Sequence, residues 1–315
     1  MTIYIISPQN RISGGPELAH QLCNAINRLS NVKAYMCYVN LEEPYNIIEN
    51  AVTPTPYLVY NTESRSDIDE IDRAGNIVIF PEGLTFSMMH IKRAKIALWW
   101  MSVDNYITST NECNVDFIKD NVFLHLFQSR YSIEYVKKMF PEANGIYLSD
   151  YINEEHGKFI YPAEGRMNNA LYNPAKGFTE IKPLIEKASW LNWIPLVKMD
   201  LPHMILTMQS SKLYVDFGNH PGKDRIPREA AADGCVVITN KKGSAAFHED
   251  VPIPEKYKFD DPASQLDDIN DLMHDICDNF LQHQNAFADY RSFIASEKAK
   301  FDEDVLNFIS VLRNS

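Results

Sequence analysis

The sequence predicts an α/β protein made of doubly wound parallel sheets. Short apolar runs alternate with amphipathic stretches along most of the 315 residues, as expected for buried parallel strands joined by crossover helices. This length favours two domains of ordinary size. Hydrophobic residues make up 45% and charged residues 23% of the chain, and this ordinary globular composition excludes a chain that is disordered as a whole.

The first half shows the alternation from its first residues. Tyr4–Ile6 predicts a strand, Ser13–Pro16 a turn, and the apolar residues from Leu18 to Leu29 recur at the spacing of a helix that Pro16 can open. Further short apolar runs predict strands at 32–39, 57–60, 77–80, 96–100, 123–127 and 145–148.

The second half repeats the pattern after a polar interruption. The alternation weakens at 153–158, and the domain boundary is placed there, after residue 155. Strands are expected at 170–172, 193–197, 212–217 and 235–239, with helices at 178–188, 203–210 and 227–233. The last stretch, from residue 260, predicts two helices joined near Phe293.

The charge balance and the absence of targeting segments exclude several functions. The chain carries 30 Lys and Arg against 42 Asp and Glu, and this negative field disfavours nucleic acid as a partner. No apolar run is long enough to cross a bilayer, and the N-terminus lacks the features of a signal peptide. We therefore expect a cytoplasmic protein. Its five scattered cysteines are expected to be buried thiols rather than disulfides or zinc ligands.

Missing motifs narrow the chemistry further. The sequence has no GxGxxG, no Walker lysine loop, no HExxH and no GxSxG. These absences disfavour the usual dinucleotide oxidoreductases, kinases, zincins and serine hydrolases.

One basic loop indicates an anion site. Between two predicted strands, Lys223, Arg225 and Arg228 gather at the start of a helix, where free N–H groups and the helix dipole already favour an anion. A phosphate or carboxylate ligand explains three cations at that end. The alternative is that these bases pair with nearby acids such as Asp216 and Asp224.

The same region carries a resemblance to a known family. The run from Glu229 to Thr239, EAAADGCVVIT, resembles the E-A-x-A-x-G-x-P-V-I stretch of nucleotide-sugar glycosyltransferases of the GT-B fold, especially family 4. In that family the opening Glu binds the ribose hydroxyls of the donor, which implies this role for Glu229. Tyr172–Gly177 is similar to the family's turn ending in Lys-Gly, whose lysine neutralises the donor diphosphate, and Lys176 matches it.

Two further segments match in chain order. Gly14 and Gly15 resemble the Gly-Gly turn after the first strand of these enzymes, and Gly243 and Ser244 occupy a later loop that faces the donor. The resemblance implies the donor-binding set Gly14, Gly15, Lys176, Lys223, Arg225, Arg228, Glu229, Gly243 and Ser244.

The resemblance also implies an architecture. We expect two Rossmann-like doubly wound domains (GT-B) facing across a cleft. Residues 1–155 would form the acceptor domain, residues 156–290 the nucleotide-sugar domain, and residues 291–315 a C-terminal helix packing back on the first domain. The implied activity is glycosyl transfer from a nucleotide sugar to a glycan or lipid-linked glycan, in surface polysaccharide synthesis. Contact with the inner face of the membrane and oligomerisation stay open.

The chain departs from the family at two positions. The acid that usually precedes the ribose Glu by eight residues is replaced by Pro221, and the arginine that usually precedes the Lys-Gly turn is Leu171. The first departure leaves the stereochemistry open. It also motivates a second hypothesis, a catalytically silent nucleotide-sugar-binding subunit of an assembly complex. A sugar-nucleotide epimerase is a third.

The catalytic base is expected in the first domain. Asp104 follows an apolar run rich in aromatic residues, at the strand end where ligands of parallel sheets bind, and Glu17 is its rival. His20 is a second rival, and both Glu17 and His20 are expected to face solvent if they are not catalytic. Asp150, near the presumed hinge, is expected to be structural. His220 borders the basic loop, where it either touches the donor phosphate or has no role.

No metal and no cofactor are expected. The pair Asp67 and Asp69 matches the Asp-x-Asp of a different, metal-dependent glycosyltransferase architecture, but it precedes a predicted strand instead of following one. We interpret it as a solvated acidic face. Cationic side chains would then stabilise the leaving diphosphate directly.

Overall fold

The computed structural model describes residues 1–41 and 47–314, which divide into two compact units. Unit 1 comprises Met1–Asp150 and the segment from Ala299 onward, and unit 2 comprises Tyr151–Lys298. The chain passes between the units just after Asp150, whereas the sequence placed this boundary after residue 155.

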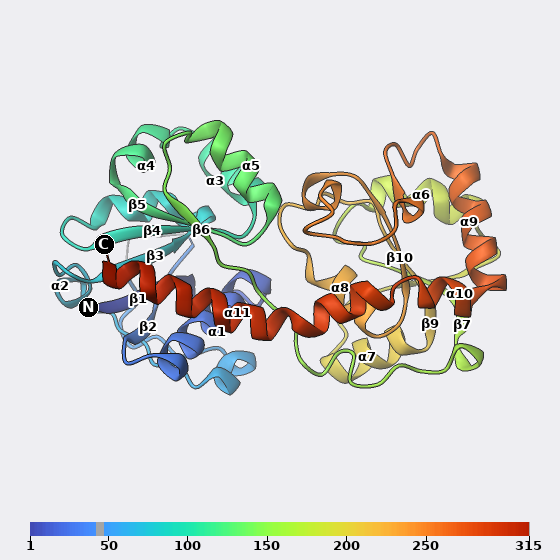
Figure 1. Ribbon diagram of the computed structural model, residues 1–315, viewed down its shortest axis with the longest axis horizontal. Coiled ribbons are helices and arrows are strands. Elements are labelled where there is room, and N and C mark those ends of the chain that lie inside the picture. Colours follow the sequence, from blue (N-terminus) through green and yellow to red (C-terminus); the bar gives the residue numbers. More distant parts are fainter. Residues whose placement is uncertain (42–46, 315) are drawn as a thin grey trace. The chain divides into compact units, whose positions relative to one another are not determined.

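Unit 1 is built on a six-stranded sheet in the order β2-β1-β3-β4-β5-β6, whose pairings are parallel. The strands are β1 (Thr2–Pro8), β2 (Lys33–Val39), β3 (Ile77–Pro81), β4 (Lys95–Trp100), β5 (Val122–Phe127) and β6 (Gly145–Tyr147). The connecting helices are α1 (Gly14–Leu29), α2 (Ile68–Ile71), α3 (Val103–Thr110), α4 (Val115–Asn121) and α5 (Arg130–Met139), with 3-10 helices η1 (Thr55–Tyr60) and η2 (Glu82–His90). Helices α3, α4 and α5 lie on one side of this sheet and α1 on the other (Figure 1).

Unit 2 repeats the design with a five-stranded sheet in the order β11-β10-β9-β7-β8, again parallel. Its strands are β7 (Met167–Tyr172), β8 (Asn192–Pro195), β9 (Ser211–Asp216), β10 (Val236–Asn240) and β11 (Lys258–Phe259). Its helices are α6 (Phe178–Lys187), α7 (Leu201–Gln209), α8 (Arg225–Ala232), α9 (Leu266–Asp278) and α10 (Phe280–Asn285), with η3 (Ala163–Gly165), η4 (Gly243–Ala246) and η5 (Glu255–Tyr257).

The last helix belongs to both units. Helix α11 (Ala288–Asn314) is continuous, so the prediction of a break near Phe293 is wrong. Its first part lies in unit 2 and its second part in unit 1, where Asp302 pairs with Arg28 at 2.6 Å.

One predicted strand is a helix. The run 57–60 reads as a buried strand, but it forms the end of η1, in which Leu58 and Val59 are exposed and Tyr57 is buried. Pro54 and Pro56 explain the difference, because proline fixes φ near a helical value and cannot donate to a sheet ladder.

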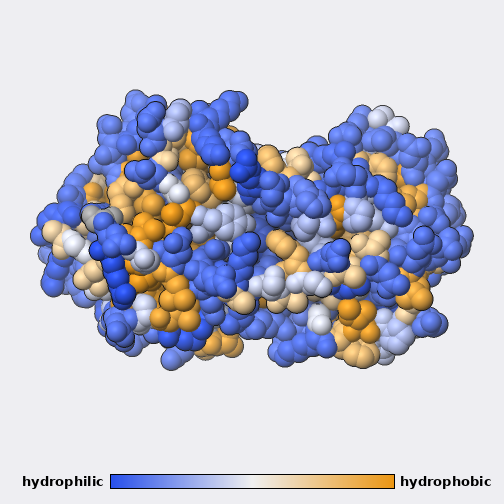
Figure 2. Space-filling model, in the orientation of Figure 1, coloured by the Kyte–Doolittle hydropathy of each residue, from blue (hydrophilic) through white to orange (hydrophobic). Residues whose placement is uncertain are grey.

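In each unit, apolar side chains are buried on both faces of the sheet. The prediction of two doubly wound α/β domains is therefore confirmed. On the face shown in Figure 2, hydrophilic residues predominate and hydrophobic ones lie in separate patches. Among residues 1–41 and 47–314, no helix has the length and apolar character required to span a bilayer.

Candidate functional site

The strand order of unit 2 points to one edge of its sheet. The connection after β7 leads to β8 on one side, whereas β9 and β10 continue the sheet on the other side. In open parallel sheets such a reversal leaves a crevice at the carboxyl ends of the strands, and ligands bind there. Apart from Gly14 and Gly15, the residues that the sequence assigns to the donor lie in the loops that follow β7, β9 and β10 or in the first turns of α8.

The loop after β7 is pressed against the loop after β9. Gly177, which caps α6, has φ 71°, a left-handed conformation that favours glycine. A Cβ on Gly177 would lie 2.5 Å from the Gly218 nitrogen, and one on Gly218 would lie 2.6 Å from Cγ of Lys176. Both positions therefore need glycine for the two loops to come this close. The contact places Lys176 next to the β9–α8 loop.

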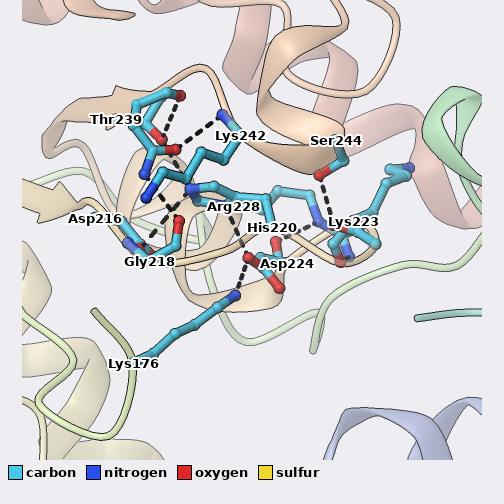
Figure 3. A network of polar contacts seen from close by, with 12 residues as sticks. Lys176, Asp216, Gly218, His220, Lys223, Asp224, Arg228, Thr239, Lys242 and Ser244 are labelled. Atoms are coloured by element: carbon cyan, nitrogen blue, oxygen red, sulfur yellow. Dashed lines mark hydrogen bonds and ion pairs between the residues drawn. The ribbon is translucent and has the colours of Figure 1, made fainter. Parts of the chain in front are cut away.

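Lys176 meets an acid in that loop. Its Nζ pairs with Oδ2 of Asp224, and Nδ1 of His220 lies 2.8 Å from the same oxygen. Figure 3 shows Lys176 reaching Asp224 from its own loop, with His220 on the other side of the carboxylate. Burial alone would raise the pKa of Asp224, but the hydrogen bond with His220 and the charge of Lys176 outweigh it and lower that pKa.

Lys223 and Arg228 differ from the prediction. Lys223 Nζ lies 2.9 Å from Oε1 of Glu297 on α11, and Arg228 Nη1 lies 2.7 Å from Oε2 of the same carboxylate. The three side chains are at most 3% exposed. The structure therefore corrects the assignment of Lys223 and Arg228 to a diphosphate: they are buried, and both pair with the same acid, Glu297.

The other two predicted residues of α8 lie nearer to solvent. Arg225 is the first residue of the helix and Glu229 lies one turn further, and both are partly buried. The charge of Glu229 acts on a nearby histidine, His156. Burial alone would lower the pKa of His156, but its hydrogen bond with Asp233 and the charges of Glu229 and Asp233 raise that pKa overall.

The loop after β10 braces the β9–α8 loop. Gly243 has φ 52°, and a Cβ there would lie 1.9 Å from the carbonyl oxygen of His220. The backbone N–H of Ser244 donates to the same carbonyl at 2.7 Å, and the buried Ser244 hydroxyl donates to the Gly222 carbonyl at 2.6 Å. The Ser244 side chain thus holds two loops together, and the assignment of Gly243 and Ser244 to the donor stays a prediction.

Unit 1 has a pocket at the corresponding place. Its strand order reverses between β1 and β3, and a cavity of about 440 Å³ opens there. Gly15 and Asp104 both line it, together with Arg11 and Glu82. The structure thus brings two of the predicted site residues, Gly15 and Asp104, to one pocket. Glu17 and Gly14 are not among its lining residues, and Glu17 accepts a hydrogen bond from the Tyr60 hydroxyl at 2.7 Å.

Glu82 is the residue that sequence reasoning missed. It directly follows β3 and is 2% exposed, and its carboxylate accepts hydrogen bonds from the Met101 N–H at 3.0 Å and the Asn105 side chain at 3.3 Å. Burial raises its pKa to about 7, although these hydrogen bonds lower it. An acid immediately after a buried run, as in Ile77–Glu82, was the available signal.

The remaining alternatives have structural surroundings. His20 is buried, and its ring nitrogens lie 2.7 Å from the Thr62 hydroxyl and 3.1 Å from the Tyr38 hydroxyl. Burial lowers the pKa of His20 to about 4. Asp150 is also buried. Neither residue lines the pocket of unit 1.

Two sets of side chains contain the atom types that could bind a metal ion. Asp67 and Asp69 are exposed, and Asp67 caps the short helix α2. Asp216, His220 and Asp224 bring ligand-type atoms within 4.8 Å of one another, but hydrogen bonds and ion pairs use these atoms: Asp216 accepts from Tyr214 and Gly218, and Asp224 pairs with Lys176 and His220. The absence of a metal requirement stays a prediction.

Comparisons with known proteins add evidence on the fold. No family model matches the chain, and no curated protein matches it. Three solved structures align over nearly the whole chain. Sucrose-phosphate synthase from Thermosynechococcus elongatus aligns with a TM-score of 0.64 and 12% sequence identity, over 99% of this chain and 98% of that chain. A trehalose-6-phosphate structure from E. coli bound with UDP-2-fluoro glucose aligns with a TM-score of 0.62 and 10% identity, over 100% of this chain and 99% of that chain. Anabaena HepE in complex with UDP aligns with a TM-score of 0.68 and 10% identity, over 99% of this chain and 100% of that chain.

At this level of identity the likeness establishes the fold. The agreement extends over both units, because the aligned segments cover at least 98% of each chain. This chain has the fold of the GT-B glycosyltransferases.

Proposed function

We propose that the protein transfers a glycosyl residue from a nucleotide sugar to a glycan acceptor, without a metal or other cofactor. The observation that carries the proposal is the convergence of Lys176, Gly177 and the β9–α8 loop at the strand reversal of sheet B, in a chain with the GT-B fold. Structures with this fold are recorded with UDP and UDP-glucose, which makes these the first ligands to test.

In this proposal unit 2 holds the donor. The Lys176 ammonium neutralises the diphosphate, Arg225 at the start of α8 adds a second cation, and the Glu229 carboxylate accepts hydrogen bonds from the ribose diol. As the sugar leaves, negative charge develops on the diphosphate, and fixed positive charge stabilises it most at that moment.

Unit 1 receives the acceptor in its pocket. Asp104 is partly exposed in the first turn of α3 and lines the cavity, so its carboxylate is the group we assign to the acceptor hydroxyl. A growing surface glycan, free or lipid-linked, is the acceptor class we propose, with the reaction in the cytoplasm.

Two substitutions test the donor site. Glu229→Ala and Lys176→Ala should each weaken binding of UDP-glucose by about 1–3 kcal/mol, the range for hydrogen bonds to charged groups, measured by calorimetry. Lys182→Ala is the matched control, because Lys182 lies on α6 with its side chain 61% exposed. Unchanged affinity in both variants would remove these residues from the donor site.

Turnover separates the proposal from its rival. Two observations favour the rival, a silent subunit that binds donor but transfers nothing: Pro221 stands in place of an acid, and Lys223 and Arg228 are buried against Glu297. Release of UDP from UDP-glucose, with or without acceptor, would exclude the silent subunit. Nuclear magnetic resonance of the product sugar distinguishes transfer from epimerisation.

A further inference from the structure

Asp224 stands between a cation that can reach solvent and a histidine that cannot. The Oδ2 atom of Asp224 contacts both Nζ of Lys176 and Nδ1 of His220. The side chains of Lys176 and Asp224 are 26% and 22% exposed, but that of His220 is 2% exposed. Of the two partners, only Lys176 is therefore placed to turn toward an incoming ligand while the other stays.

The other side of the His220 ring accepts either protonation state. Its Nε2 lies 3.0 Å from Oγ1 of Thr239, and the same hydroxyl lies 3.2 Å from the Asn240 carbonyl. With neutral His220 the hydroxyl donates to Nε2. With protonated His220 it accepts from Nε2 and donates to the carbonyl. The buried ring thus keeps both hydrogen bonds in both states, and no polar atom is left unsatisfied.

Other charged and titratable groups surround the ring. Asp216 Oδ1 lies 3.9 Å from Nε2. The small cavity beside His220 includes Lys223, Arg228, Asp250 and Tyr290 among its lining residues. Glu297 pairs with both Lys223 and Arg228. The carboxylate in closest contact with the His220 ring is that of Asp224, 2.8 Å from Nδ1.

We propose that binding of a nucleoside diphosphate at Lys176 makes His220 take up one proton from solvent. The proposal rests on the proposed function, because it requires a diphosphate at Lys176. In the free protein the Lys176 ammonium already neutralises the Asp224 carboxylate, so no imidazolium is required beside it. When Lys176 turns to the diphosphate, Asp224 loses its cation, and the imidazolium form of His220 replaces it. The charge balances: one ammonium moves to the ligand, and one proton enters from water.

The proposal predicts a specific dependence on pH. A ligand that binds with uptake of a proton binds more tightly as pH falls. If loss of the Lys176 ion pair shifts the titration by about one pH unit, the affinity for UDP should fall as the pH rises, by no more than about tenfold in total.

Calorimetry measures the proton directly. UDP is titrated into the full-length protein at pH 7 in PIPES and in Tris, whose ionisation enthalpies differ, and the difference in observed heat gives the number of protons taken up. We expect uptake of a substantial fraction of one proton. His220→Asn should abolish the uptake, because its amide can still donate to Asp224 but cannot titrate. His203→Asn is the matched control: His203 also faces an aspartate, Asp200 at 3.3 Å, but is 76% exposed.

A second measurement needs no ligand and does not depend on the folding of a histidine variant. In Lys176→Met the carboxylate of Asp224 has already lost its cation. The imidazole resonances of His220 should therefore titrate about one pH unit higher than in the wild type, as followed by nuclear magnetic resonance. An unchanged titration would overturn the proposal.

The outcomes distinguish the two hypotheses. If neither UDP nor UDP-glucose binds but the Lys176→Met titration shifts, the donor assignment has failed and the coupling within the network stands. If UDP binds without proton uptake, the proposed function survives and this inference is wrong.

Discussion

Glu82 gives the sharpest prediction for a single residue, because burial raises its pKa from the ordinary 4.5 to about 7. Below pH 4.5 both the folded and the unfolded protein carry the proton, and this residue's contribution to stability is fully present. As pH rises to 7, the unfolded chain ionises first, so the free energy of unfolding falls by about 3 kcal/mol. Glu82→Gln should remove this loss, as measured by urea unfolding at pH 5 and pH 8.

The control for this substitution is another glutamate of unit 1. Glu142 is exposed, and Glu142→Gln should leave the wild-type difference between the two pH values unchanged. An equal difference in wild type and Glu82→Gln would show that Glu82 ionises in the folded protein much as it does in the unfolded chain. Since Glu82 also holds Met101 and Asn105 beside Asp104, its protonation bears on the geometry of the proposed acceptor pocket.

At the scale of elements, the contact between α8 and α11 depends on one carboxylate. Glu297 faces both Lys223 and Arg228 in a buried cluster, and Arg228 also donates to the Asp224 and Lys223 carbonyls at 3.1 and 3.0 Å. Removing one partner of a buried pair leaves an uncompensated charge. Glu297→Gln should therefore lower the free energy of unfolding by about 3–5 kcal/mol, measured with urea.

An exposed acid on the same helix is the control for that variant. Glu303 is exposed, and Glu303→Gln should change the free energy of unfolding by no more than about 0.5 kcal/mol. If the two variants are equally stable, the cluster contributes little and the burial of its charges is compensated elsewhere. In either case Glu297 explains why two cations of the basic loop are turned away from the strand edge.

For the whole molecule, the sequence predicted most of what depends on local pattern. The alternation of apolar runs with helical periodicity is a local pattern of side-chain hydrophobicity, and it correctly predicted two doubly wound sheets. The positions of Lys176 and Gly177 followed from a short motif, and the packing of Gly177 against Gly218 shows why glycine is needed there.

The errors have a common physical cause, which is contact between residues far apart in sequence. Glu297 lies 69 residues beyond Arg228, and nothing near Arg228 indicates that an acid on the last helix will neutralise it. The surroundings of the Glu82 carboxylate depend in the same way on a distant residue, because the Met101 N–H that donates to it follows strand β4. The helix at Thr55–Tyr60 was missed because its apolar residues look like a strand and only the two prolines signal otherwise.

Hydrogen exchange tests how the whole chain responds to the donor. UDP should slow exchange in three segments of unit 2 that meet at the strand reversal, because bound ligand reduces local opening. They are 173–178, 241–246, and 217–229, which includes the start of α8. Helix α9 contributes none of these residues and serves as the internal control. UDP-glucose should give the same protection, and additional slowing at Gly14 and Gly15 would support their assignment to the donor. Protection confined to the pocket of unit 1 would instead place the nucleotide there and exclude Lys176 and Glu229 as its ligands.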